Sequence, residues 1–250
     1  MSLNINEENL YLVLPANVSF KESNIGDSME SDFTLFARVK IDKEKITEKE
    51  TFIISRSGMH SGISVFKSQT GKIFLQYTYW FENIEDITNS IKQVYVELKD
   101  SILEDFINVY MVNNDEKAKI SCYLNGDVVG SIIYPGLKKI SYIDSPYWIG
   151  CGGMFTEDIE SRGIGDFEYD IIFSVKKRLS NLDIDDILEN YYLKYSDLIF
   201  ENYRVFKESW ELSKYFAFFC DFKISNRYKI WNYAFNGSYP QIYIEGNVYY

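Results

Sequence analysis

The chain has 250 residues, of which 46% are hydrophobic and 25% charged, with only 14 Gly and 4 Pro. This composition suits a large globular domain and excludes a disordered, collagen-like or linker-dominated protein. The formal net charge of -11 argues against nucleic acid and anionic membranes as partners, because binding a phosphate backbone requires a cationic face. Aromatic residues make up 17% of the chain, which suits half-buried strands and also carbohydrate stacking or protein interfaces.

Three cysteines, Cys122, Cys151 and Cys220, are too few and too scattered for a disulfide framework or a metal knuckle. We expect them to be free, buried thiols. The first nine residues lack the basic and apolar regions of a secretory signal, and the densest apolar run, Tyr215 to Cys220, is too short for a membrane span. We therefore expect no membrane insertion and a cytoplasmic location for the chain as given, or an extracellular one for a domain cut from a secreted protein.

Alternation with a period of two dominates the first 175 residues. Phe33, Leu35, Ala37, Val39 and Ile41 alternate with more polar neighbours, which predicts a strand with one buried face. Similar runs predict seven further strands at 51–56, 62–67, 72–81, 93–98, 106–113, 118–125 and 128–134. Because no helical pattern lies between these runs, the sequence favours an antiparallel sandwich or barrel over a parallel α/β sheet.

Two local signals are more specific. Asn125-Gly126 predicts a type I′ turn that joins residues 119–124 to 127–133 in a tight hairpin, because both residues tolerate positive φ. Ser180 and Asp183 resemble a capping box, and Ile184, Ile187 and Leu188 follow at helical spacing. The sequence therefore predicts one late helix after the strands.

The last 55 residues do not follow this pattern. Residues 196–250 carry 17 of the 43 aromatic residues, so this segment must bury aromatic side chains against the domain, a second chain or an adjoining domain. Tyr215, Phe216 and Phe219 have helical spacing, whereas 228–235 and 241–250 resemble strands. We predict a domain at 1–195 and an aromatic-rich, mixed extension at 196–250, and we expect a chain that ends at Tyr195 to unfold cooperatively.

The order of these segments resembles the concanavalin A-like lectin/glucanase superfamily in its laminin-G-like form. The matching segments are DFTLFARVK (32–40), IISR (53–56), GISVF (62–66), CYLNGDVVG (122–130), YWIG (147–150), and the strand and helix at 170–180 and 184–188. This resemblance covers about residues 8–195 and implies an all-β, two-sheet antiparallel jelly-roll sandwich. The aromatic-rich composition also resembles that of the jelly-roll half of clostridial neurotoxin binding regions. The superfamily includes lectins, glycosidases, lyases and interaction modules, so the site must be argued directly.

Catalytic and metal motifs are weak in this sequence. Asp166, Glu168 and Asp170 are the nearest imitation of a glucanase acid strand, and we interpret them as a solvated strand face rather than catalytic residues. His60, the single histidine, lacks a paired nucleophile motif and is interpreted as a solvated turn residue. The resemblance implies calcium as an alternative, with Glu82, Glu85 and Asp86 in a rim loop. We predict no metal and no cofactor, because no EF-hand-like spacing occurs and acidic loops are common in a chain of net charge -11.

Carbohydrate binding requires an aromatic ring against the sugar and polar side chains for its hydroxyl groups. The outward face of the strand at 72–81 offers Trp80 beside Gln76, unless Trp80 is covered. Arg38, Asn108 and Tyr110 alternate outward on strands that the family pattern places in the sandwich. These five residues are the predicted carbohydrate-binding site.

The sequence thus predicts a non-catalytic, lectin-like module that binds a glycan or polysaccharide, such as the accessory domain of a glycosyltransferase or another glycan-handling enzyme. The alternative is a protein-interaction or assembly module, in which residues 196–250 mediate a homo-oligomer or contact an adjoining domain. A glycosidase or polysaccharide lyase is the third hypothesis.

Overall fold

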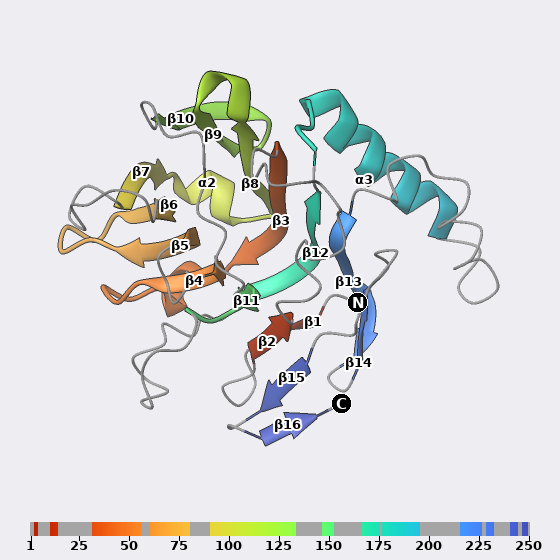
Figure 1. Ribbon diagram of the computed structural model, residues 1–250. Coiled ribbons are helices and arrows are strands. Elements are labelled where there is room, and N and C mark those ends of the chain that lie inside the picture. Colours follow the sequence, from red (N-terminus) through yellow and green to blue (C-terminus); the bar gives the residue numbers. More distant parts are fainter. Residues whose placement is uncertain are drawn as a thin grey trace.

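The computed structural model is a sandwich of two antiparallel sheets with one long helix packed on its outside (Figure 1). It describes residues 3–4, 11–14, 32–56, 61–80, 91–133, 147–152, 167–175, 177–195, 216–226, 229–232, 241–244 and 247–249. The predicted fold class, an all-β two-sheet antiparallel jelly-roll sandwich with one late helix, is confirmed.

Sheet A holds the strands that carry the late helix. Its order is β10 (Asp127–Ile133), β9 (Lys119–Leu124), β8 (Ile107–Asn114), β3 (Phe33–Ile41), β12 (Phe167–Val175), β13 (Phe216–Asn226) and β14 (Lys229–Asn232), and β1 (Leu3–Asn4) pairs with β12. Because each neighbouring pair is antiparallel, every described strand of this sheet runs opposite to the strand beside it.

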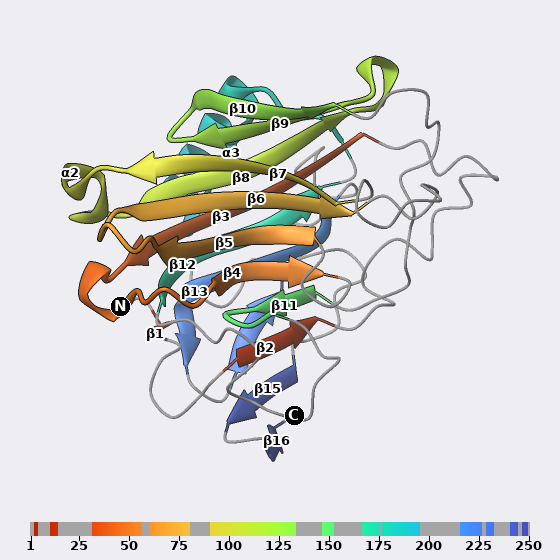
Figure 2. The same ribbon diagram turned by 90° about the vertical axis from the view of Figure 1, so that its left-hand side faces the viewer.

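Sheet B forms the second layer. Its order is β16 (Asn247–Tyr249), β15 (Gln241–Ile244), β2 (Tyr11–Leu14), β11 (Tyr147–Ile149), β4 (Thr51–Arg56), β5 (Ser61–Lys67), β6 (Ile73–Trp80) and β7 (Ile91–Leu98). Short helical turns lie at the strand ends: η2 (Lys43–Lys45), α2 (Asp100–Leu103) and η3 (Asp115–Lys117). Figure 2 looks onto the outer face of sheet B, where β4, β5, β6 and β7 lie side by side.

The predicted hairpin has the expected turn. Strands β9 and β10 pair across Asn125 and Gly126, whose φ angles of 49° and 90° are both positive. Positive φ at both central residues is the requirement of a type I′ turn, whose twist matches that of the flanking strands. The strand boundaries and the turn were therefore both predictable from local sequence.

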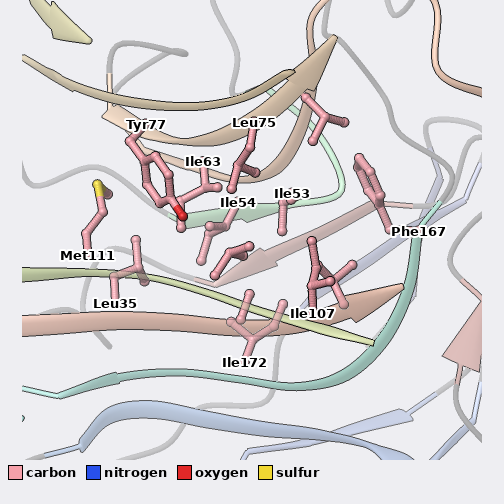
Figure 3. Close-up of a cluster of buried hydrophobic side chains, with 14 of the residues drawn as sticks. Leu35, Ile53, Ile54, Ile63, Leu75, Tyr77, Ile107, Met111, Phe167 and Ile172 are labelled. Atoms are coloured by element: carbon pink, nitrogen blue, oxygen red, sulfur yellow. The ribbon is translucent and has the colours of Figure 1, made fainter. Parts of the chain in front are cut away.

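The main core lies between the two sheets, where the inward side chains of the alternating strands meet. Figure 3 shows it with Leu35, Met111 and Ile172 from sheet A facing Ile63, Leu75 and Tyr77 from sheet B. Two buried phenols complete their hydrogen bonding within it: the Tyr169 hydroxyl donates to the carbonyl of Ile53 at 2.7 Å, and the Tyr77 hydroxyl donates to the carbonyl of Tyr123. Buried donors with partners avoid the cost of an unsatisfied polar group.

The three cysteines are free and buried, as predicted. Burial raises the pKa of the Cys122 thiol to about 12 and that of Cys220 still further above its ordinary value. Since the thiolate is the reactive form, these thiols are structural groups of the core.

A second apolar cluster lies on the outer side of sheet A, beneath helix α3 (Asn181–Tyr195). Phe36, Tyr110, Phe173 and Phe219 point outward from sheet A and pack with the helix residues Ile184, Ile187 and Leu188. The rings of Phe36 and Phe173 stack at 4.6 Å between centroids. Helix α3 therefore covers much of the outer face of sheet A, whereas no described helix or strand covers β4–β7 on the outer face of sheet B (Figures 1 and 2).

Helix α3 begins with the predicted capping box. The Ser180 backbone amide and hydroxyl both donate to Asp183 Oδ2 at 2.7 Å, and the Asp183 amide donates to Ser180 Oγ at 3.2 Å. These reciprocal bonds satisfy backbone donors that have no partner inside the helix. They also lower the pKa of Asp183, because both donors favour its ionised form.

Removing this cap is expected to destabilise the protein in a pH-dependent way. Ser180→Ala should lower the free energy of unfolding by about 1 kcal/mol at pH 7. The Asp183 pKa is lower in the folded chain, so its stabilisation is present above the unfolded value near pH 4 and is lost as the pH falls through the folded value. Urea unfolding of both proteins at pH 7 and pH 3 measures this, and an equal difference at both pH values would contradict it.

The C-terminal segment joins both sheets. The helical spacing of Tyr215, Phe216 and Phe219 was misleading, because residues 216–226 form strand β13, whose register pairs it with β12 and β14. Phe218 and Phe222 face the core between the sheets while Phe219 faces the cluster under α3, so both faces of this strand are buried. A strand buried on both faces loses the polar and apolar alternation that identifies half-buried strands. The extended pattern near the C-terminus is confirmed by β14, β15 and β16.

Candidate functional site

The predicted site residues whose side chains are described lie on opposite outer faces of the sandwich. Gln76 and Trp80 belong to β6 of sheet B, where their neighbours Leu75 and Tyr77 point into the core. Arg38, Asn108 and Tyr110 belong to β3 and β8 of sheet A. The structure therefore places Arg38 opposite Asn108 on neighbouring strands but does not bring either of them to Gln76. The side chain of Trp80 lies outside the described residues.

Tyr110 lies beneath helix α3. Its side chain is 2% exposed, its ring stacks on Tyr123 at 4.5 Å between centroids, and its hydroxyl donates to Asn181 Oδ1 at 2.7 Å. Asn181 in turn donates from Nδ2 to the carbonyl of Gly126 at 2.7 Å. Tyr110 thus joins the start of α3 to sheet A, and its burial raises the pKa of its phenol.

Arg38, which is partly exposed, forms an ion pair with the buried Asp170. The Nε atom of Arg38 is 3.2 Å from Oδ2 of Asp170, whose side chain is 1% exposed, and the guanidinium lies 5.9 Å from the ring centroid of Phe106. The prediction of a solvated carboxylate face is wrong for Asp170. The register of β12 shifts between Tyr169 and Ile171, so Asp170 is the extra residue of a bulge and turns toward Arg38.

The outer face of sheet B carries a connected set of polar and aromatic side chains, called here the aromatic-polar face. Its members come from the residue before β4 and from β5, β6 and β7: Glu50, Ser64, Phe66, Phe74, Gln76, Thr78, Gln93 and Tyr95. Cross-strand pairing explains why they meet, since Ser64 lies opposite Gln76 and Gln76 lies opposite Tyr95. Residues directly opposite on neighbouring strands point to the same side of a sheet.

Glu50 is the centre of the polar part of this face. Its Oε1 accepts hydrogen bonds from Ser64 Oγ at 2.6 Å and from Gln76 Nε2 at 2.8 Å, and Gln76 Nε2 also lies 3.0 Å from Thr78 Oγ1. Glu50 is half-buried, and this burial raises the pKa of its carboxyl while the bond from Ser64 opposes the shift. The network fixes these polar groups before any ligand arrives.

Aromatic side chains border the network. Phe66 and Phe74 stack at 5.7 Å between centroids, and Tyr95 meets Phe66 edge to face at 6.1 Å. Tyr95 is 51% exposed although it is a large hydrophobic residue, and its hydroxyl donates to Gln93 Oε1 at 2.6 Å. Packing against Phe66 and the bond to Gln93 hold the exposed ring in one orientation, which is what a stacking platform requires.

The sequence identified one member of this face and missed the others. Gln76 was predicted, and the alternation of Gln93, Tyr95 and Glu97 in the predicted strand at 93–98 carried a signal for Tyr95. Nothing local distinguishes Glu50 from the other acids in a chain of net charge -11, because its role depends on partners 14 and 26 residues away.

A separate cavity of about 380 Å³ lies between η2, α2 and the start of β12. Its charges are largely satisfied within the chain: Lys43 Nζ pairs with Asp100 Oδ2 at 3.1 Å, and Lys45 Nζ lies 4.0 Å from Asp42 Oδ2. Exposed ion pairs of this kind contribute little to stability, and none of the described residues that line this cavity is aromatic. We therefore place the candidate site on the aromatic-polar face.

Several sequence predictions lie outside the described residues. They concern His60, the acidic rim loop with Glu82, Glu85 and Asp86, and Asp166. Within the described ranges, no group of three or more histidine, cysteine, aspartate or glutamate side chains is placed to hold a metal ion. None of the helices described is both long enough and apolar enough to cross a bilayer.

No protein-family model matches the chain, and no curated protein sequence matches it. Among solved structures it is similar to a native heptameric SAP-like pentraxin from Limulus polyphemus, at 15% identity and a TM-score of 0.42, over 73% of this chain and 76% of the pentraxin chain. It is also similar to the botulinum neurotoxin serotype D binding domain, at 20% identity and a TM-score of 0.42, and to a receptor binding domain, at 16% and 0.46. The chain covers 38% of the length of each of these two structures. At this similarity, function has to be derived from the chain's own side chains.

Proposed function

We propose that this protein is a non-catalytic, lectin-like module that binds a glycan or polysaccharide on the aromatic-polar face of sheet B. The observation that carries the proposal is an exposed, fixed aromatic ring, Tyr95, placed directly beside a preformed polar network around Glu50 and Gln76. The proposed site keeps Gln76 from the sequence-based set and replaces its sheet A members with Tyr95, Gln93 and Glu50.

The chemistry of this face matches what a sugar presents. A pyranose ring has an apolar C–H face and an edge of hydroxyl groups, so a binding site needs an aromatic plate and fixed polar groups next to it. Tyr95 supplies the plate, and Gln93 and Glu50 supply polar groups at the surface, with Ser64, Gln76 and Thr78 forming the floor beneath. Within the described part of the chain, the Gln76 side chain donates from Nε2 to Glu50 and to Thr78.

A binding module of this kind would hold a polysaccharide near a catalytic domain, so we propose the accessory domain of a glycan-handling enzyme as its context. The proposal requires no cofactor. Calcium is varied in the experiment because the acidic rim loop predicted at 82–86 is the alternative metal site.

Replacing Tyr95 is expected to weaken glycan binding without unfolding the protein. Tyr95→Ala removes the stacking ring and should weaken binding about tenfold, whereas Tyr95→Phe keeps the ring and should lose less. Because the side chain is half exposed, the free energy of unfolding should change by no more than about 1 kcal/mol. A glycan array, run with and without calcium, measures binding by the three proteins.

The matched control for this experiment is Val128→Ala on β10 of sheet A, a residue that is 58% exposed and lies opposite Tyr123, which packs against the cluster under α3. It should bind as the unaltered protein does. Retained binding by Tyr95→Ala would remove the aromatic-polar face from the site. If the unaltered protein binds no glycan on the array and forms a stable oligomer in light scattering, the alternative of an assembly module would be favoured.

A further inference from the structure

Two carboxylates, Glu50 and Glu97, lie on the aromatic-polar face or at its border. Glu97 points to this face from β7, but it is paired with Lys72, whose Nζ lies 2.8 Å from Glu97 Oε2. Glu50 is different, because both groups that donate to it, Ser64 and Gln76, are uncharged. Among the described members of this face and its border, Glu50 is therefore the charge that no lysine or arginine compensates.

The position of Glu50 makes this charge effective. The carboxylate is half-buried and lies beside Gln76, which sits directly opposite Tyr95 across the strands. Charges near a partly desolvated surface interact more strongly than charges in open water. A carboxylated or sulfated sugar stacked on Tyr95 would bring a second negative charge next to Glu50, whereas an uncharged sugar would offer hydroxyl groups that can donate to it.

The charge of the whole chain acts in the same direction. A net charge of -11 repels polyanions at long range and slows their approach. Like charges brought together at an interface are a common means of rejecting a wrong partner.

We propose that the aromatic-polar face selects uncharged glycans, and that Glu50 is the specificity-determining residue that rejects glycans carrying carboxylate or sulfate groups. This inference rests on the proposed function, since it concerns the same face. It goes further by naming the chemical class of the ligand and the residue that sets it.

The test uses pairs of related glycans, each with an uncharged and an anionic member. The probes are cellohexaose and its C6-carboxylated form, and N-acetyllactosamine oligomers with and without terminal sialic acid. We expect the full chain, at low salt, to bind the uncharged member of a pair on the order of tenfold more tightly than the anionic member. This applies to each pair whose uncharged member binds at all. This ratio should shrink as the salt concentration approaches 1 M, because salt screens the repulsion.

Glu50→Gln isolates the residue, since glutamine keeps an acceptor for Ser64 and removes the charge. This variant should bind the anionic probes more tightly while its affinity for uncharged probes changes less, so the ratio should fall toward one. The matched control is Glu104→Gln, which removes the same charge from an exposed position beside α2 and should leave the ratio unchanged. Thermal unfolding of both variants shows whether they fold, and the salt dependence of the unaltered protein tests the same repulsion independently.

The outcomes separate this inference from the proposed function. The proposed selectivity would be overturned if the unaltered protein bound uncharged and anionic members with equal affinity. It would also be overturned if Glu50→Gln and Glu104→Gln changed the ratio of the two affinities equally. Neither result would overturn glycan binding itself. Absence of binding to every probe, on these pairs and on the array, would overturn the proposed function itself.

Discussion

A chain that ends at Tyr195 is expected to lose its cooperative unfolding transition. Truncation there removes β13, so residues 171–175 of β12 lose the strand with which they pair. It also removes Phe218, Phe219 and Phe222, which are all 0% exposed. The sequence alone led to the opposite expectation, because the family-like pattern ends with helix α3.

The free energy of unfolding that these three side chains contribute decides between the two expectations. Phe218 meets Tyr147 edge to face at 5.1 Å, Phe219 stacks on Phe173 at 5.7 Å, and the ring of Phe222 lies 5.2 Å from Tyr169. Deleting three fully buried phenylalanine side chains costs on the order of 10 kcal/mol. A whole domain has a net stability of about 5 to 15 kcal/mol, so the shortened chain should not hold a stable fold.

Circular dichroism and dye binding on heating measure this outcome. The control is a chain that ends at Asn232, which keeps β13 and β14 and, of the described strands, loses β15 and β16 at the edge of sheet B. It should retain a sigmoidal transition, whereas the chain that ends at Tyr195 should bind hydrophobic dyes and unfold without one. A sharp transition in both chains would show that residues 1–195 fold alone.

The second large effect is expected at Gly62 in β5. Its φ is +155°, and a Cβ added there would lie 2.8 Å from the Cα of Ser55 and closer still to the carbonyl oxygen of Ile54 on the paired strand β4. Because both contacts are backbone atoms near the middle of sheet B, no side chain can rotate away to relieve them. Gly62→Ala should therefore lower the free energy of unfolding by on the order of 3 kcal/mol.

Gly71→Ala is the matched control for this substitution. Gly71 also has a positive φ, +82°, but a Cβ there would have no atom within 4 Å. Its replacement should cost only the backbone strain, about 1 kcal/mol. Guanidinium unfolding of both variants separates the two effects, and equal losses of stability would show that the approach of β4 to Gly62 is not what requires glycine.

Much of this fold was predictable because its signals are local. The period of two in strands such as β3, the positive-φ pair Asn125-Gly126 and the Ser180 to Asp183 cap each depend on a few neighbouring residues. Strand β13 lacked such a signal, since it is buried on both faces and its aromatic residues fit a helix as well as a strand.

The site was less predictable because its geometry depends on long-range pairing. The sequence placed Gln76 and Arg38 on outward faces, but not on which sheet, and the structure puts them on opposite sides of the sandwich. The burial of Asp170 depends on a bulge, and the role of Glu50 depends on contacts with Ser64 and Gln76 from two other strands. A single sequence does not reveal register shifts or contacts of this kind.

The most direct test of the central claim is to map where a glycan contacts the protein. Backbone amide shifts in two-dimensional NMR, recorded while a glycan selected on the array is titrated in, report this for each assigned residue. We expect the largest shifts at Ser64, Gln76 and Tyr95 and little change along α3. Shifts that cluster around Arg38 and Asn108 on sheet A, with β5, β6 and β7 unchanged, would contradict the account.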